Sequence, residues 1–268
     1  MKVIMNQQPS FSRRSFLKSA SLAATATVLP WGEAAAETGG KSKKKGYCGG
    51  NGTGHKQIKP AWFYTWSRSG KGGIDGIEFV PMVKGRINLG QKTFDAIRAQ
   101  KNITHLLGYN EPERKKQGNL SVEEGLKHWP KLEKLARDKN LRLGSPAVSN
   151  DQGGNQWLDE FMKGVKRNKL KVDFLALHWY SGTDIRQFDN WLDDMYKKYR
   201  LPLWLTEFNG WSGTHEEMAE FAIKAFKILE KHRRVERYAY FNKPKGKPGS
   251  IWKADGSLSE IGLALAAL

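Results

Sequence analysis

The sequence predicts an α/β fold, a single (β/α)8 barrel of the TIM type. The chain has 268 residues, 39% of them hydrophobic, which suffices for one large core and for a small barrel of about 200–250 residues. Short β-rich runs alternate with amphipathic helical patterns, as in repeated βα units around a parallel sheet. Periodicity does not distinguish a closed barrel from a doubly wound open sheet, so closure is an inference.

The predicted elements follow one another along the chain from residue 61. Eight strands are expected at 61–64, 77–82, 104–109, 141–145, 172–178, 203–206, 238–241 and 250–252. The clearest helices are expected at 93–100, 122–139, 156–167, 185–199 and 216–232. In the last of these, three-to-four spacing of apolar residues predicts a buried face made of Met218, Phe221, Ala222, Ala225, Phe226 and Leu229.

The amino-terminal segment 1–36 has the features of a twin-arginine signal peptide. Arg13 and Arg14 precede a mildly apolar stretch at 20–29, and Ala34-Ala35-Ala36 resembles a cleavage site. The stretch is shorter and less apolar than the roughly 20 residues that span a membrane. We therefore expect export to the periplasm or the medium, a Gly/Lys-rich lead-in at 37–57, and a catalytic domain at 58–268.

The composition excludes several functions. Cys48 is the only cysteine, so an intrachain disulfide cannot form and redox chemistry is disfavoured. The formal charge of +18 could attract nucleic acid, but the lysines are scattered and no nucleic-acid motif accompanies them, which favours a solvated basic surface. The Gly-rich run 49–54 lacks a preceding strand and a following Lys-Ser/Thr pair, so it predicts a turn and not a phosphate loop.

Two glutamates follow apolar strands at positions where barrel enzymes carry their functional groups. They are Glu111, in Asn110-Glu111-Pro112, and Glu207, in Thr206-Glu207-Phe208. Either alone could be a surface acid or a helix cap. Together they match glycoside hydrolysis, which needs one carboxylic acid for the leaving oxygen and a second carboxylate as nucleophile or base.

Three neighbours of the glutamates have chemical uses. Asn110 can bind the sugar 2-hydroxyl as the transition state forms. His178 and Tyr180 alternate along one strand, point to the same side, and could orient an ionised nucleophile; the alternatives are a buried histidine satisfied by backbone and a packing tyrosine. His105 stays unassigned. We find no metal-ligand spacing and no G-x-S-x-G elbow, and expect no cofactor.

The chain contains ten tryptophans, a surplus that suits stacking on sugar rings. The aromatic residues near predicted strand ends are candidates for substrate binding, although some must belong to the core: Trp62, Tyr64, Trp66, Trp179, Trp211 and Trp252. Three others lie in helical patterns, where packing is the better interpretation: Trp129, Trp157 and Trp191.

In these motifs the sequence resembles glycoside hydrolase family 128, the endo-β-1,3-glucanases of a clan of retaining (β/α)8 hydrolases. The resemblance rests on segments 61–66, 79–82, 110–112, 145–147, 173–180, 203–208 and 255–258. It implies that Glu111 is the acid/base and Glu207 the nucleophile of an enzyme that cuts inside β-1,3-glucan. It also implies that Asn110 assists Glu111 and that Tyr180 lies beside Glu207.

Three positions depart from the family pattern: Thr65, Lys84 and Tyr240, the last replacing a tryptophan that usually forms a substrate platform. We expect Tyr240 to bind substrate in its place. The resemblance also places the acid/base after a fourth strand, whereas our count puts Glu111 after a third. We therefore expect a further strand near Tyr47 or Arg86. The expected protein is a monomer, and its partner is β-1,3-glucan. The alternatives are transglycosylation by the same glutamates and a non-catalytic barrel that binds polysaccharide or the cell envelope.

Overall fold

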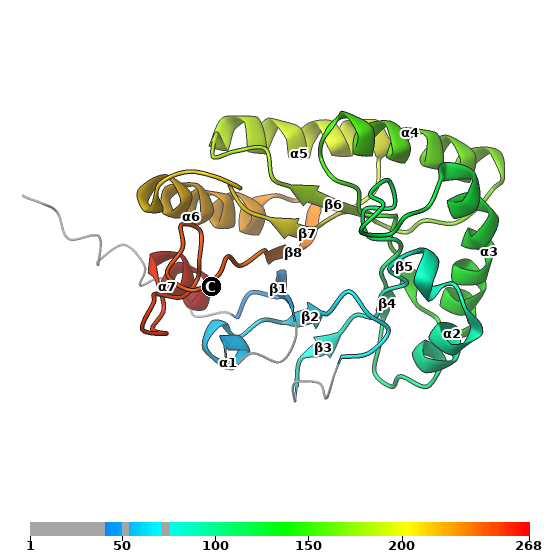
Figure 1. Ribbon diagram of the computed structural model, residues 1–268, viewed down its shortest axis with the longest axis horizontal. Coiled ribbons are helices and arrows are strands. Elements are labelled where there is room, and N and C mark those ends of the chain that lie inside the picture. The colour runs from blue at the N-terminus through cyan, green and yellow to red at the C-terminus, as the bar shows by residue number, and fades with distance from the viewer. Residues whose placement is uncertain (1–40, 50–53, 71–75) are drawn as a thin grey trace, which may run out of the picture. The chain divides into compact units, whose positions relative to one another are not determined.

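The structure is a computed structural model that describes residues 41–49, 54–70 and 76–268 (Figure 1). The expected signal peptide and most of the Gly-rich run at 49–54 lie outside these residues. Across the described ranges, no helix combines the length and the apolar character needed to cross a membrane.

Eight parallel strands form two sheets in the described part of the chain. The strands are β1 (Lys45–Cys48), β2 (Trp62–Tyr64), β3 (Glu78–Phe79), β4 (His105–Leu106), β5 (Arg142–Leu143), β6 (Leu175–Trp179), β7 (Leu203–Phe208) and β8 (Val235–Tyr240). Six of them pair in the order β3-β2-β1-β8-β7-β6, and β4 pairs with β5. Single parallel bridges join Met82 to Leu107 and Gly144 to Phe174, which lie beside β3, β4, β5 and β6.

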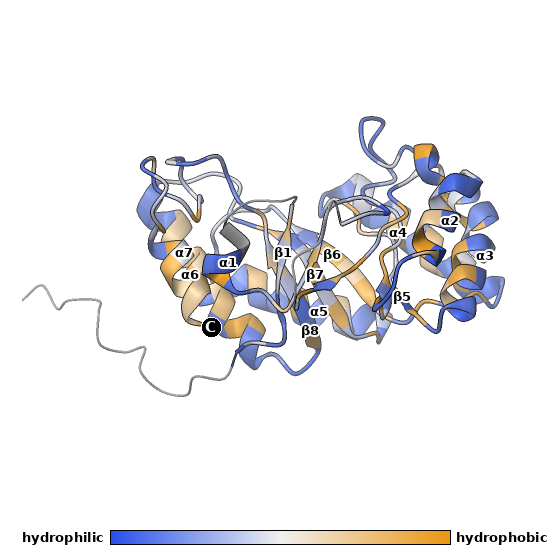
Figure 2. Cartoon of the chain, turned by 90° about the horizontal axis from the view of Figure 1, so that it is seen from below, coloured by the Kyte–Doolittle hydropathy of each residue, from blue (hydrophilic) through white to orange (hydrophobic). Residues whose placement is uncertain are grey.

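Helices alternate with these strands in the described residues. They are α1 (Gly54–Ile58), the 3₁₀ helix η1 (Arg86–Asn88), α2 (Gln91–Arg98), α3 (Val122–Asp138), α4 (Gln152–Arg167), α5 (Ile185–Tyr199), α6 (His215–Lys231) and α7 (Glu260–Ala267). Ser121 and Thr214 begin α3 and α6 with capping boxes that satisfy free backbone N–H groups. Figure 2 shows hydrophobic and hydrophilic stretches alternating along α2 and α3, as expected for helices with one buried face.

Two apolar clusters form the core. The larger packs the strands against the helices and includes the predicted α6 face apart from Met218, which is buried outside it, together with Trp129 and Trp157. The smaller cluster draws side chains from β1, β2, β6, β7 and β8 and from residues beside β3, β4 and β5. Its centre is aromatic: the ring of Trp204 lies 5.2 Å from that of Trp62 and 4.1 Å from that of Phe174.

The structure corrects the predicted boundaries in two places. The expected strand near Tyr47 exists as β1, so the folded domain begins before residue 58, within the segment predicted as a lead-in. The strand predicted at 250–252 is wrong: this segment contributes only an antiparallel bridge between Trp252 and Leu258, in a region rich in Gly and Pro turns. With β1 counted, Glu111 follows the fourth strand, as the family resemblance requires.

Candidate active site

One buried imidazole joins the two predicted carboxylates at the carboxyl ends of the strands. Glu111 follows β4, Glu207 lies near the end of β7, and His178 lies in β6 opposite Glu207 in the strand register. Nδ1 of His178 lies 3.2 Å from Oε1 of Glu111, and Nε2 lies 3.4 Å from Oε1 of Glu207. A register shift between Leu177 and His178 aims the imidazole, as β-bulges often do beside active sites.

A tight turn after β4 positions Glu111. The residue has a φ of 41°, and its N–H donates to the carbonyl of Ala147 at 2.6 Å. The backbone N–H of the preceding Asn110 donates to the carbonyl of Lys84. The side chain of Asn110 is buried, yet its Oδ1 has no hydrogen-bond partner among the described residues. Buried amide oxygens are normally satisfied, so Asn110 presents a free acceptor beside Glu111.

Three aromatic donors hold the Glu207 carboxylate. Oε1 accepts hydrogen bonds from the Tyr64 hydroxyl at 3.1 Å and from the Trp66 indole at 2.6 Å, and Oε2 accepts one from the Tyr180 hydroxyl at 2.5 Å. Burial and the negative charge of Glu207 raise the pKa of Tyr64 and of Tyr180, so both hydroxyls keep their protons. Hydrogen bonds donated to a carboxylate favour its ionised form.

The pKa values of His178 and Glu111 depend on each other because their side chains are in contact. Burial lowers the pKa of His178, but the charges of Glu207 and Glu111 outweigh burial and raise it above its ordinary value. Burial in turn raises the pKa of Glu111. The hydrogen bond from His178 and the positive charges of His178, Arg114 and Lys84 outweigh this effect, and the net pKa of Glu111 is lowered.

An aromatic rim surrounds the carboxylates. The ring of Trp66 lies 5.3 Å from that of Tyr64 and 6.2 Å from that of Phe241. Tyr180 contacts Phe241 at 5.7 Å and Trp211 at 5.6 Å, edge to face in both pairs. Trp211 is 59% exposed, an unusual state for a large apolar side chain, and so offers an open ring beside the site.

Several aromatics predicted to bind substrate belong instead to the core. Trp62, Trp179 and Tyr240 are buried and offer no face to a sugar. Because side chains alternate along a strand, the residues that face the site at 178, 180 and 241 turn Trp179 and Tyr240 toward the helices. Trp179 packs on Phe188, and the Tyr240 hydroxyl donates to the carbonyl of Gly249. Phe241, the residue after Tyr240, faces the site and takes the place where a substrate platform was expected from Tyr240.

Two other predictions differ in detail. Tyr64 is buried and supports Glu207 through its hydroxyl, so it does not act as a stacking surface. Trp252 is half-buried and packs against the larger core cluster before α7. The helical aromatics Trp129, Trp157 and Trp191 pack in or against that cluster, as predicted.

The sequence pattern missed two asparagines that hold the rim. The buried Asn209 donates from Nδ2 to the carbonyl of Phe241 at 2.9 Å and accepts at Oδ1 from the N–H of Trp211 at 2.6 Å. Oδ1 of Asn150 accepts the N–H of Tyr180 at 3.1 Å. Both asparagines follow strand ends, and this position was the available signal. His105, left unassigned, lies at the opposite end of the strands, where its Nδ1 is 3.2 Å from Glu78.

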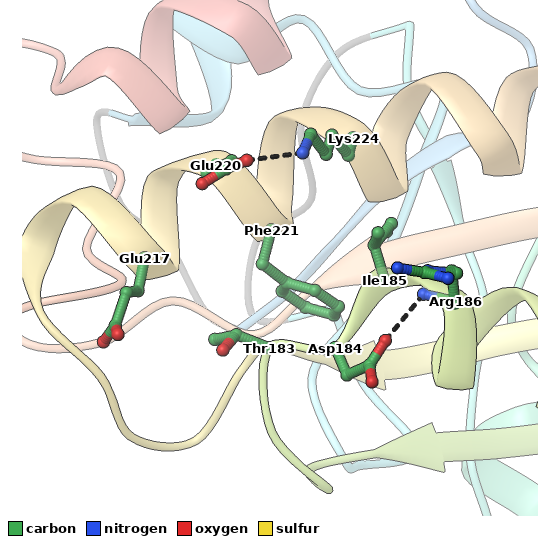
Figure 3. Close-up of a pocket in the computed structure, with 8 residues that line it drawn as sticks. All are labelled: Thr183, Asp184, Ile185, Arg186, Glu217, Glu220, Phe221 and Lys224. Atoms are coloured by element: carbon green, nitrogen blue, oxygen red, sulfur yellow. Dashed lines mark hydrogen bonds and ion pairs between the residues drawn. The ribbon is translucent and has the colours of Figure 1, made fainter. Parts of the chain in front are cut away.

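The rest of the described surface offers few other sites. Within residues 41–49, 54–70 and 76–268, no group of three or more His, Cys, Asp or Glu side chains could hold a metal ion. A pocket of about 370 Å³ lies between the start of α5 and α6 (Figure 3). It is lined by charged side chains such as Asp184, Arg186 and the Glu220–Lys224 ion pair, and it contains neither Glu111 nor Glu207.

A carboxylate pair ringed by aromatics at the carboxyl ends of parallel strands is typical of the glycoside hydrolases. The family described as glycosyl hydrolase catalytic core matches residues 47–264. An endo-β-1,3-glucanase of family 128, subgroup I, from Amycolatopsis mediterranei, solved with laminaritriose, is 31% identical. The alignment covers 84% of this chain and 99% of that one, with a TM-score of 0.73. The chain therefore belongs to the glycosyl hydrolase catalytic-core family, among the β-1,3-glucanases of glycoside hydrolase family 128.

Two further relatives differ in activity or in length. A curdlan-specific exo-β-1,3-glucanase of family 128, subgroup III, from Blastomyces gilchristii is 30% identical, with a TM-score of 0.72. That alignment covers 84% of this chain and 98% of that one. Alkali-sensitive linkage protein 1 of Schizosaccharomyces pombe is 28% identical over 75% of this chain, and the match spans only 39% of that curated relative.

Proposed function

We propose that the protein is a retaining endo-β-1,3-glucanase that works by double displacement. The observation that carries the proposal is the contact of one buried imidazole, His178, with both Glu111 and Glu207. In this mechanism Glu111 protonates the departing glycosidic oxygen and Glu207 attacks the anomeric carbon. Glu111 then removes a proton from the water that releases the glycosyl-enzyme.

We assign the nucleophile from the donors around each carboxylate. Glu207 receives hydrogen bonds from Tyr64, Trp66 and Tyr180, which together fix the direction of its carboxyl group. Its side chain is 7% exposed, against 15% for Glu111. The more accessible Glu111 suits exchange of a proton with the leaving group and then with water.

The lowered pKa of Glu111 in the free protein is opposite to what a general acid needs. The lowering depends on His178 and on the positive charges of Arg114 and Lys84, and it opposes burial, which raises the pKa. A bound glucan chain excludes water and strengthens the effect of burial. We therefore expect Glu111 to take up its proton as substrate binds.

We further propose that the strands close into a (β/α)8 barrel. The bridges Met82–Leu107 and Gly144–Phe174 lie between β3 and β4 and between β5 and β6, where the two sheets would join. The smaller core cluster, which draws on or beside all eight strands, is the interior expected of such a barrel. Closure would place the loops after β4 and β7 on one rim.

The test is to incubate the purified protein with soluble β-1,3-glucan, with cellulose- and xylan-derived polymers alongside. We expect a ladder of oligosaccharides from the β-1,3-glucan alone, and NMR of the first products should show the β-anomer. Glucose as the main early product would indicate exo action, the activity of the relative from Blastomyces gilchristii. Binding without any cleavage would support a non-catalytic polysaccharide-binding protein. When β-1,3-linked oligosaccharides are given as the substrate, products longer than these oligosaccharides would indicate transglycosylation.

A further inference from the structure

The two flanks of the glutamate pair each carry a lysine without an acidic partner. Lys84 follows β3, the neighbour of the Glu111 strand, and Lys243 follows β8, the neighbour of the Glu207 strand. Neither Lys84 nor Lys243 forms an ion pair within the described ranges. Five lysines of the described ranges form ion pairs, namely Lys134, Lys171, Lys197, Lys198 and Lys224, and many others form none, so the place of Lys84 and Lys243 beside the glutamates is what sets these two apart.

Lys84 is half-buried beside the acid/base candidate. Its carbonyl accepts the backbone N–H of Asn110, so the backbone ties it to the residue before Glu111. Its positive charge is close enough to act on the Glu111 carboxylate. A ligand bound at this end of the site would therefore meet the positive charge of Lys84 close to Glu111.

Lys243 places a second charge on the exposed rim. Its Nζ lies 4.3 Å from the centre of the Trp211 ring, and Trp211 contacts Tyr180, which binds Glu207. The loop 241–259 contains four lysines and one acid, Asp255. Asp255 already accepts hydrogen bonds from Ser257. One face of the Trp211 ring thus carries an ammonium group, and a sugar bound at this part of the rim would lie near that charge and near the basic loop.

We infer that the substrate is a β-1,3-glucan that carries anionic substituents, held by Lys84 and Lys243 on the two sides of the glutamates. This inference rests on the proposed hydrolase function and adds the charge class of the polymer. The substituents belong on sugars flanking the cleaved bond, since the glutamates themselves would repel a negative charge at the centre. Carboxylate and sulfate groups offer the same chemistry to an ammonium.

The experiment compares initial rates on neutral β-1,3-glucan and on the same polymer bearing carboxymethyl or sulfate groups. We expect kcat/KM to be about tenfold higher for the anionic polymers at low salt. Two exposed ion pairs, each of which strengthens binding by up to about fivefold, would allow this difference. The preference should disappear near 1 M salt, where the screening length falls to about 3 Å. A difference between the two anionic polymers would show which substituent the site favours.

Variants assign the preference to the two lysines. In the double variant Lys84→Gln, Lys243→Gln the ratio of anionic to neutral kcat/KM should fall to about one. The matched control Lys227→Gln removes an exposed lysine from α6, on another part of the surface, and should retain the ratio. A preference that persists in the double variant would overturn the assignment. Equal rates on neutral and anionic glucan would overturn the inference but leave the hydrolase, whereas no cleavage of any β-1,3-glucan would refute the hydrolase itself.

Discussion

The two ends of the same strands each hold a buried histidine beside a glutamate, and the two arrangements are opposite in charge balance. At the amino end, Glu78 lies 3.2 Å from His105 and 2.6 Å from Arg237, so its charge is matched. Arg142 and Glu236 form a second pair there at 2.8 Å. At the carboxyl end, two glutamates share the single imidazole of His178. At the amino end each carboxylate has its own basic partner, whereas at the carboxyl end the two carboxylates have one basic side chain in direct contact, with Arg114 and Lys84 acting on Glu111 without an ion-pair contact.

The two histidines respond to these surroundings in opposite directions. Burial lowers the pKa of His105, and although Glu78 raises it, the nearby Arg237 and Arg142 help to keep the net value low. The charges of Glu207 and Glu111 raise the pKa of His178 despite complete burial. The pKa of the same residue type is therefore lowered in the structural network and raised in the candidate site, because of the sign of its neighbours.

The largest expected effect comes from Glu207→Gln at the carboxyl end. Loss of the nucleophile should reduce kcat by at least about 10⁴-fold, while glucan binding and the urea midpoint stay close to those of the wild type. Turnover is measured as reducing ends released from β-1,3-glucan, and binding by calorimetry. Wild-type turnover in this variant would remove Glu207 from the mechanism.

The matched substitution Glu78→Gln at the amino end should reduce stability and leave activity unchanged. It removes the partner of Arg237, whose side chain is only 17% exposed, and should lower the free energy of unfolding by about 3 kcal/mol. At 25 °C, where the variant remains folded, kcat/KM should equal that of the wild type. Urea unfolding and steady-state rates test the two halves of this prediction, and a large loss of activity without loss of stability would contradict it.

The pH dependence of stability should also separate the two ends. The pKa of Glu78 is lowered from 4.5 to about 2 by His105, Arg237 and Thr104, although burial opposes them. Stability from Glu78 is therefore present above pH 4.5 and is lost as the pH falls toward 2, by up to about 2 kcal/mol. The raised pKa of His178 acts in the other direction: its contribution is complete below its ordinary pKa of 6.5 and is lost as the pH rises through the raised value.

Urea titrations at several pH values measure these two arms. Glu78→Gln should flatten the acid arm and leave the alkaline arm. His178→Asn should flatten the alkaline arm, and it should also reduce the acid arm somewhat because His178 lowers the pKa of Glu111. A change of the alkaline arm in Glu78→Gln, or an unchanged alkaline arm in His178→Asn, would show that the charge assignment of that histidine network is wrong.

The smallest effect is expected at the rim. Trp211→Ala removes an exposed ring and should raise KM for glucan oligosaccharides about three- to tenfold, within the range measured for one aromatic contact. The urea midpoint should not move, since the ring is 59% exposed. An unchanged KM would show that Trp211 lies outside the path of the substrate.

Much of the site was predictable because its signals are local. A polar residue directly after an apolar strand marks the carboxyl end, and this rule brought Glu111, Glu207 and Asn110 to attention. The alternation of His178 and Tyr180 correctly predicted that both would face Glu207. The same alternation, applied to Trp179 and Tyr240, would have assigned both to the core.

By itself the sequence predicted the α/β class, most of the strands and helices and the two carboxylates that meet at His178, since these predictions depend on periodicity and on neighbours along the chain. Tertiary structure decided that Lys45–Cys48 is a strand between β2 and β8, since its hydrogen-bond partners lie far away in sequence. It also set which residues of neighbouring strands lie opposite one another, because irregularities in β6 and β7 shift the register. The contact of one imidazole with both glutamates arises only when β4, β6 and β7 end together, so that burial and charge at His178 are properties of the assembled fold.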